Sequence, residues 1–180
     1  MGDVYHEQLI KRKTTVIDIL TRILFILLTL SAFSISFLGA QTLIGIAFFA
    51  LSVVFAYLTR YMFQRTNVEY EYSFLSGEIQ VDRVFGKARR KHYINFDMTK
   101  VEVVAHEESD QLEQFERQNY NFKDVTSLNP DARIYVAFVR DDSGLTKIAF
   151  EPNDEILEDM KNYAPRKVYI DETKKFTDRT

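Results

Sequence analysis

The densest group of positively charged side chains in the sequence surrounds Gly86. Its candidate binding residues are Arg83, Lys87, Arg89, Arg90 and Lys91. Lysine and arginine donate charge-assisted hydrogen bonds to phosphate and carboxylate oxygens, which predicts a site for anionic lipid head groups or for a protein partner. The alternative is a solvated turn whose charges offset acidic residues on neighbouring strands, namely Glu69, Glu71, Glu78 and Asp82.

No other set of residues predicts a reaction. The three histidines, His6, His92 and His106, lack a second ligand at a recurring metal spacing, so we expect no metal site. There is no cysteine, which excludes thiolate chemistry. Phosphate loops, nucleophile elbows and dinucleotide fingerprints are also missing from the sequence. We therefore expect no catalytic residue and no cofactor, and a membrane-tethered hydrolase would need a deep polar pocket around His92 or His106.

The elements that position the basic cluster are predicted to be strands. Val68, Tyr70, Tyr72 and Phe74 alternate with polar residues, which is typical of a strand with one buried face. Similar patterns and turn residues predict seven antiparallel strands, at about 68–74, 78–85, 89–96, 100–106, 120–127, 133–140 and 145–151. Residues 107–118 are predicted as either a loop or a short helix that begins at Ser109.

A C-terminal helix is expected to cover this sheet. Asn153 is a favourable N-cap, and Ile156, Leu157 and Met160 recur at helical spacing before Pro165 ends the helix. The predicted fold class is thus an α+β domain with a seven-stranded antiparallel sheet or barrel and one C-terminal helix.

Two long apolar runs, 19–38 and 42–63, precede the strands and are separated by three residues. A bilayer core of about 30 Å needs roughly 20 helical residues, so both runs are long enough to span it. A cleaved secretory signal is the alternative for the first run, but this run is longer than a usual signal and leads directly into the second. The sequence predicts a two-helix transmembrane hairpin at 16–65.

Small residues recur along both predicted spans and favour close approach of two helices. They are Thr29, Ala32, Ser36 and Gly39 on the first span, and Gly45, Ser52 and Ala56 on the second. We expect this seam to join the two helices of the hairpin, the alternative being contact between subunits. Arg22 follows Asp18 at helical spacing, which predicts a local ion pair.

The charges that flank the hairpin predict its orientation. Lys11, Arg12 and Lys13 precede the first span, Arg60 and Arg65 close the second, and the connection between the spans is uncharged. The bias of lysine and arginine places both termini in the cytoplasm. The expected organisation is a cytoplasmic segment at 1–15, the hairpin at 16–65, a cytoplasmic domain at 66–170 and a polar tail at 171–180.

The predicted cytoplasmic domain is acidic. Asp and Glu outnumber Lys and Arg from Thr66 onward, although the whole chain carries a net charge of only −3. An acidic domain is not expected to bind a nucleic-acid backbone.

Seven strands followed by one helix resembles the pleckstrin-homology (PH) fold. Two adjacent membrane helices, then the strand VEYEY at 68–72, then a late hairpin leading into FEPN at 150–153, is similar to bacterial PH-like membrane proteins of unknown function. The resemblance implies a membrane-tethered domain and supplies no functional residue. Eukaryotic PH domains bind phosphoinositides with a basic loop between the first two strands, whereas the basic cluster here lies between the second and third predicted strands.

Together these features predict a noncatalytic binding or scaffold domain that a hairpin holds at the cytoplasmic surface of the bacterial plasma membrane. Its expected partners are the lipid bilayer and either a protein or anionic lipid head groups. The alternative is a homo-oligomeric membrane scaffold, assembled through the small-residue seam or an exposed sheet edge.

Overall fold

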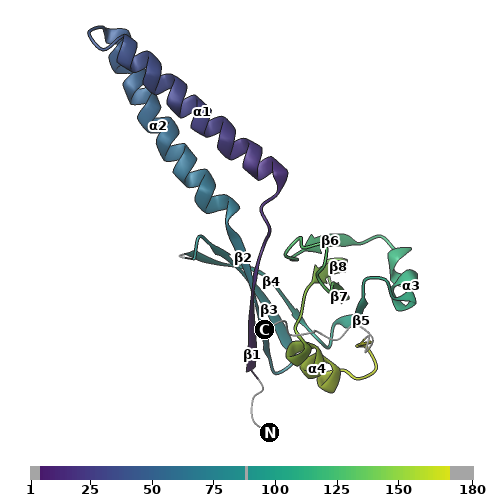
Figure 1. The fold of residues 1–180 in the computed structure, drawn as a ribbon. Coiled ribbons are helices and arrows are strands. Elements are labelled where there is room, and N and C mark those ends of the chain that lie inside the picture. Colours follow the sequence, from purple (N-terminus) through teal and green to yellow (C-terminus); the bar gives the residue numbers. More distant parts are fainter. Residues whose placement is uncertain (1–4, 88, 171–180) are drawn as a thin grey trace. The chain divides into compact units, whose positions relative to one another are not determined.

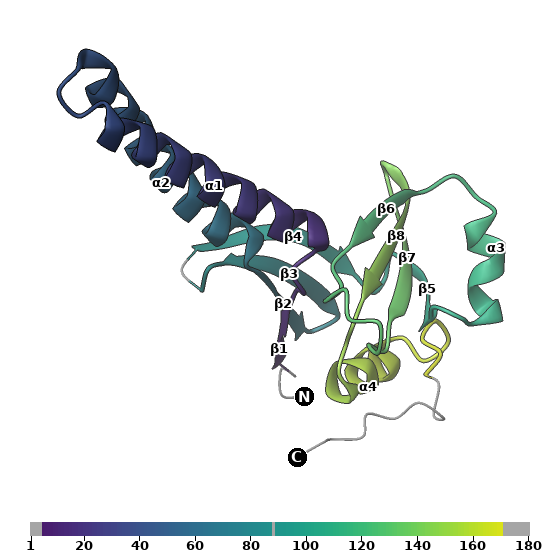
Figure 2. The same cartoon turned by 45° about the horizontal axis from the view of Figure 1, so that its top comes forward.

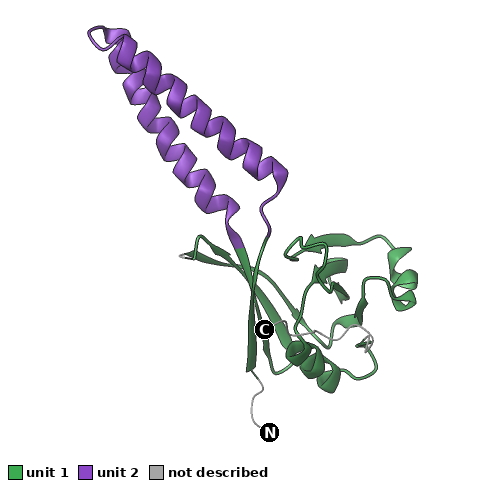
Figure 3. Cartoon of the chain, viewed as in Figure 1, with its two compact units in different colours: residues 1–12, 69–180 green, residues 13–68 purple. Residues whose placement is uncertain are grey.

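The computed structural model describes residues 5–87 and 89–170. The chain divides into two compact units, which Figure 3 colours separately: Lys13–Val68 form one, and Met1–Arg12 together with Glu69–Thr180 form the other. The predicted polar tail at 171–180 lies outside the described residues.

The first of these units is a helical hairpin. Helix α1 spans Val16–Leu38 and helix α2 spans Leu43–Thr66 (Figure 1). Both helices are long and apolar enough to cross a membrane. Most of their large apolar side chains face outward, and Leu38 and Leu43 are 87% and 85% exposed. Such a continuous apolar surface is unfavourable in water and is typical of a membrane interaction.

Small residues lie where the two helices meet. The buried residues of α1 are Ala32 and Ser36, and those of α2 are Gly45 and Ser52. A Cβ atom on Gly45 would lie only 2.0 Å from the Gly39 carbonyl oxygen, so a larger residue cannot fit without moving the backbone. The small-residue seam therefore joins the two helices of the hairpin at these four residues, whereas Ala56, which the sequence also places in the seam, is exposed.

Arg22 does not pair with Asp18 as the sequence predicts. Its Nε donates to the Thr66 hydroxyl at 2.9 Å, and its guanidinium carbon lies 4.7 Å from the centre of the Phe63 ring. The Asp18 carboxylate instead accepts the backbone N–H of Thr15 at 3.1 Å, as part of a capping box. Asp18 caps the N-terminus of α1, because the first backbone N–H groups of a helix have no hydrogen-bond acceptor within the helix.

The second unit contains two four-stranded sheets (Figures 1 and 2). One sheet has the order β1-β2-β3-β4, and the other has the order β5-β7-β8-β6. The strands are β1 (Tyr5–Lys11), β2 (Val68–Leu75), β3 (Glu78–Phe85), β4 (Arg89–Asp97), β5 (Val101–His106), β6 (Asn121–Asp124), β7 (Tyr135–Asp141) and β8 (Gly144–Phe150). The helices are η1 (Asp110–Leu112), α3 (Glu113–Glu116) and α4 (Asp154–Tyr163).

The prediction of one seven-stranded sheet is wrong, because the described residues form eight strands in two sheets. The additional strand, β1, precedes the hairpin and pairs with β2 from Tyr5↔Leu75 to Lys11↔Glu69. The sequence of β1 lacks a clear alternation of apolar and polar residues. Two of the side chains with which β1 contacts the rest of the unit are polar. His6 contacts Asp159, and Gln8 donates to the Glu151 carbonyl at 3.0 Å.

Other predictions are confirmed or corrected in detail. The predicted strand at 78–85 is confirmed as β3, and α4 is capped by Asn153, whose side chain accepts the N–H of Ile156 at 2.9 Å. The strand predicted at 120–127 is shorter, and it pairs parallel to β8 instead of joining an antiparallel meander. Residues 107–118 contain the two short helices η1 and α3.

The core of this unit combines aromatic and aliphatic side chains. Tyr72 and Phe96 each place a ring 6.3 Å from that of Phe150, in edge-to-face geometry. The buried Tyr72 hydroxyl donates to the Val125 carbonyl at 2.6 Å, so its polar end is satisfied. Helix α4 contributes the fully buried side chains Ile156, Leu157 and Met160. A smaller cluster packs around Phe138, with Phe115 of α3 against it.

Candidate functional site

The predicted basic cluster lies at the hairpin between β3 and β4. Strand β3 ends at Phe85, and the turn contains Gly86 and Lys87, with φ angles of 55° and 60°. These left-handed backbone conformations are typical of tight turns between antiparallel strands. The strands pair as Phe85↔Arg89, Val84↔Arg90, Arg83↔Lys91 and Asp82↔His92. Ala88 lies outside the described residues.

Strand geometry divides the cluster between two faces of the sheet. Residues directly opposite each other in an antiparallel pair share a face, and successive residues alternate. Arg83, Arg89 and Lys91 therefore lie on one face, and Arg90 lies on the other. The five candidate residues do not form one continuous surface.

Arg90 is ion-paired. Its Nη1 lies 3.0 Å from Oε1 of Glu71, a residue that is only 7% exposed. Nearby, His92 Nδ1 lies 3.1 Å from Oδ1 of Asp82. On this face the charges of the β3–β4 hairpin offset acidic residues of neighbouring strands, which is the alternative that the sequence leaves open.

The carboxyl groups of Glu7 and Glu71 interact on the same face. Burial raises the pKa of Glu71, and hydrogen bonding to Glu7 and the negative charge of Glu7 raise this pKa further. The Tyr5 hydroxyl donates to Glu7 at 2.8 Å, and this bond is the main cause that lowers the pKa of Glu7. Burial and the neighbouring Glu7 thus act against ionisation of Glu71, whereas the positive charge of Arg90 favours it.

Arg83 lies on the opposite face among aromatic rings. Its guanidinium carbon is 3.4 Å from the centre of the Tyr93 ring and 5.6 Å from that of Tyr70. Its Nε is buried, and no described residue accepts a hydrogen bond from it. Lys123, on β6 of the other sheet, places its Nζ 5.8 Å from the same Tyr93 ring.

Sequence reasoning missed Tyr93 and Lys123 as neighbours of the cluster. Tyr93 lies where the register of β3 and β4 shifts, between the pairs Val81↔Ile94 and Asp82↔His92. Lys123 is brought close only by the pairing of β6 with β8, where it lies opposite Ile148. No local pattern in the sequence predicts either arrangement.

Three of the candidate side chains are exposed at the end of the sheet: Lys87, Arg89 and Lys91. We call them the turn cations. No described residue forms an ion pair with any of them. Because β2 and β3 are joined by a two-residue turn, the β3–β4 turn lies at the same sheet end as the Lys11↔Glu69 pair, through which the chain enters and leaves the hairpin.

Within residues 5–87 and 89–170, no three His, Cys, Asp or Glu side chains are close enough to hold a metal ion. His106 is buried with its ring edge-on to Tyr135, and its Nδ1 accepts the N–H of Glu108 at 3.3 Å.

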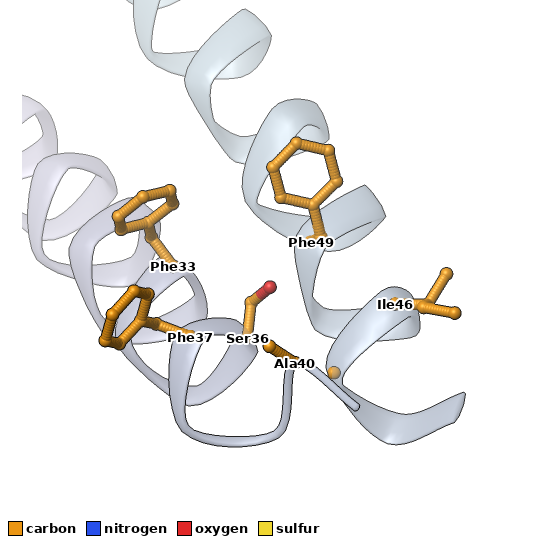
Figure 4. A pocket seen from close by; sticks show the side chains of 7 residues that line it. Phe33, Ser36, Phe37, Ala40, Ile46 and Phe49 are labelled. Carbon is orange, nitrogen blue, oxygen red and sulfur yellow. The ribbon is translucent and has the colours of Figure 1, made fainter. Parts of the chain in front are cut away.

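Two shallow pockets have volumes of about 360 and 340 Å³, and neither includes a histidine. The first is apolar and lies at the tip of the hairpin, where Figure 4 shows Phe33, Ser36, Phe37, Ala40, Ile46 and Phe49. The second is polar and is lined by Asp110, Gln111, Glu113, Gln114 and Arg117.

The family of bacterial PH-like domains (DUF6106) has a model that matches residues 2–170, a range that includes β1, both hairpin helices, both sheets and α4. No curated protein and no solved structure matches the chain.

Proposed function

The chain belongs to the family of bacterial PH-like domains, and from this we propose that it is a noncatalytic binding module anchored in the bacterial plasma membrane. The α1–α2 hairpin is the anchor, both termini are cytoplasmic, and the turn cations bind anionic lipid head groups. The observation that carries this proposal is a set of exposed cations without acidic partners among the described residues, at the sheet end to which the hairpin is joined.

The short connections limit how far the turn can lie from the bilayer. Only Asn67 separates α2 from β2, and four residues separate β1 from α1. At about 3.5 Å per residue, the α2 connection reaches roughly 7 Å. The β3–β4 turn is one to two strands further across the sheet, or roughly 5–10 Å. A hairpin that spans the bilayer thus keeps the turn cations within reach of the head-group layer.

The charge distribution supports the same orientation. From Thr66 onward the chain has more Asp and Glu than Lys and Arg, so an anionic leaflet repels most of this unit. Each turn cation contributes about 1 kcal/mol of attraction near an anionic surface. Tethering by the hairpin lets contacts this weak act at a high effective concentration.

No second function is favoured by a specific observation. The small-residue seam, one of two surfaces considered for a homo-oligomeric scaffold, lies between α1 and α2 of the same chain. One sheet edge is also occupied, because the backbone of residues 167–169 bonds to Val104 of β5 at 2.7 and 2.8 Å.

Hydrogen–deuterium exchange on the full chain in lipid nanodiscs tests the proposal. We expect residues 86–91 to exchange more slowly in discs that contain phosphatidylglycerol than in discs of phosphatidylcholine alone. The difference should disappear in a Lys87→Gln, Arg89→Gln, Lys91→Gln variant and should weaken in 0.5 M salt, because exposed charges are screened.

A matched control removes three exposed cations elsewhere: Lys100→Gln, Arg117→Gln, Arg166→Gln. It changes the net charge equally and should keep the protection at residues 86–91. Equal exchange of the wild-type turn in both kinds of disc would contradict the proposal.

A further inference from the structure

We propose that Arg83, Lys91 and Lys123 form a site for one phosphate group, with the Tyr93 ring supporting the two nearest cations. We call these four residues the phosphate site. The inference deepens the proposed function and rests on it for one source of the phosphate, a lipid head group; a soluble phosphate compound is the other source.

The register of β3 and β4 supplies the first argument. Arg83 and Lys91 are directly opposite each other. Like charges in this position destabilise a strand pair, because their side chains start only about 5 Å apart. On the other face of the same hairpin, Asp82 lies opposite His92, which is a favourable combination. A bound anion would reverse the sign of the Arg83–Lys91 interaction.

The surroundings of Arg83 supply the second argument. Its guanidinium lies against Tyr93, its Nε is buried, and no described residue accepts a hydrogen bond from it. A buried donor without an acceptor is unfavourable. Contact with the Tyr93 ring restricts the guanidinium group, so its remaining N–H groups are preorganised to donate to an oxyanion.

Lys123 supplies the third argument, by contrast with Lys147 on the neighbouring strand. Both lysines lie near tyrosine rings, Lys123 beside Tyr93 and Lys147 beside Tyr120. Lys147 also bonds Glu116 at 2.6 Å, whereas Lys123 has no ion pair with any described residue. The cation beside Tyr120 thus has an acid to balance it, whereas no acid pairs with Lys123 among the described residues.

Three cations that converge from β3, β4 and β6 favour phosphate over a single carboxylate. A phosphate presents several oxygens in a tetrahedral arrangement and up to two negative charges. Donors from two different sheets can each reach a different oxygen, which a planar carboxylate does not allow.

NMR of the full chain in uncharged maltoside micelles tests the site. The reporter is the Nε–H signal of Arg83, identified by its loss in Arg83→Lys. We expect a saturable shift on titration with glycerol 3-phosphate, and no such shift with acetate or chloride at equal ionic strength. Lys123→Gln should weaken the apparent affinity roughly tenfold, the loss expected for one charge-assisted hydrogen bond. Lys147→Gln is the matched control and should leave the affinity unchanged.

A second arm distinguishes the two sources of phosphate. In nanodiscs without added phosphate, a shift of the Arg83 signal with phosphatidylglycerol but not phosphatidylcholine assigns the site to a lipid head group. A response to glycerol 3-phosphate alone assigns it to a soluble compound. An Arg83 signal unmoved in both arms, or moved equally by acetate, overturns the site, as does an affinity that Lys123→Gln leaves unchanged.

The two proposals can fail separately. Exchange protection of residues 86–91 depends on all three turn cations, and two of them, Lys87 and Arg89, are not part of the phosphate site. Protection of that turn with an unmoved Arg83 signal retains the proposed function and refutes the phosphate site.

Discussion

Arg90 reaches across β3 to Glu71, with 3.0 Å between its Nη1 and the Oε1 of that carboxylate. The arginine side chain is 67% exposed and the glutamate side chain is 9% exposed, so a surface cation neutralises a buried acid. Oε2 of Glu71 is itself buried and has no hydrogen-bond partner among the described residues. Arg90 thus has a structural role that its neighbours at the turn lack.

The first prediction follows from this pair. Arg90→Met leaves Glu71 buried without a counter-ion, and we expect a loss of about 1–3 kcal/mol in the free energy of unfolding. Arg89→Met, one residue away, should change it by less than about 0.5 kcal/mol, since its side chain is exposed. Urea unfolding of the full chain in detergent, followed by circular dichroism, measures both. Equal losses in the two variants would show that the ion pair contributes nothing.

The second prediction concerns the contact between His6 on β1 and Asp159 on α4. The hydrogen bond to Asp159 raises the pKa of His6, and the charges of Asp159 and Glu155 act in the same direction. The folded state therefore favours the protonated imidazole. Its stabilisation is complete below the ordinary histidine pKa of about 6.5, and it is lost as the pH rises through the raised value.

Unfolding of the wild type and of His6→Gln across pH 5 to 9 measures this effect. The wild type should be the more stable protein at the acidic end, and its advantage should shrink as the pH rises. Asp159→Asn should remove the same pH dependence, because it removes the acceptor. An advantage that stays constant or grows with pH would exclude His6 as the source.

The third prediction concerns the tip of the hairpin. Gly45→Ala places a methyl group within 2.0 Å of the Gly39 carbonyl oxygen, so the two helices must separate there. We expect a lower thermal midpoint for loss of helical circular dichroism in detergent. Ile46→Ala is the control, because it changes the neighbouring residue, whose side chain is 63% exposed. If both variants have the same thermal midpoint as the wild type, the close approach of Gly45 and Gly39 does not stabilise the hairpin.

Much of the fold follows from local patterns, and the exceptions have physical causes. Alternation of apolar and polar residues predicts β3 because one of its faces is buried, as at Ile79 and Val81. Strand β1 lacks that pattern, since His6 and Gln8 make polar contacts with α4 and the segment before it. Its pairing depends on β2, 57 residues away across the hairpin from Lys11 to Val68.

The candidate site was predictable only in part. The sequence shows a cluster of cations around a turn. The alternation of side chains along a strand also predicts that Arg90 lies on one face of the sheet, and Arg89 and Lys91 on the other. The partner of Arg90 requires the order β2-β3-β4, and the position of Lys123 requires the pairing of β6 with β8. Contacts between sheets leave no periodic signal along the chain.

Cysteine accessibility tests the central claim, a membrane hairpin that keeps the sheet domain in the cytoplasm. The chain has no cysteine, so Gln41→Cys at the hairpin tip and Asp142→Cys in the β7–β8 turn each provide one thiol, both at exposed positions. In intact bacteria, a membrane-impermeant maleimide should label Gln41→Cys, and should label Asp142→Cys only after the inner membrane is permeabilised. Labelling of Asp142→Cys in intact cells would contradict the account.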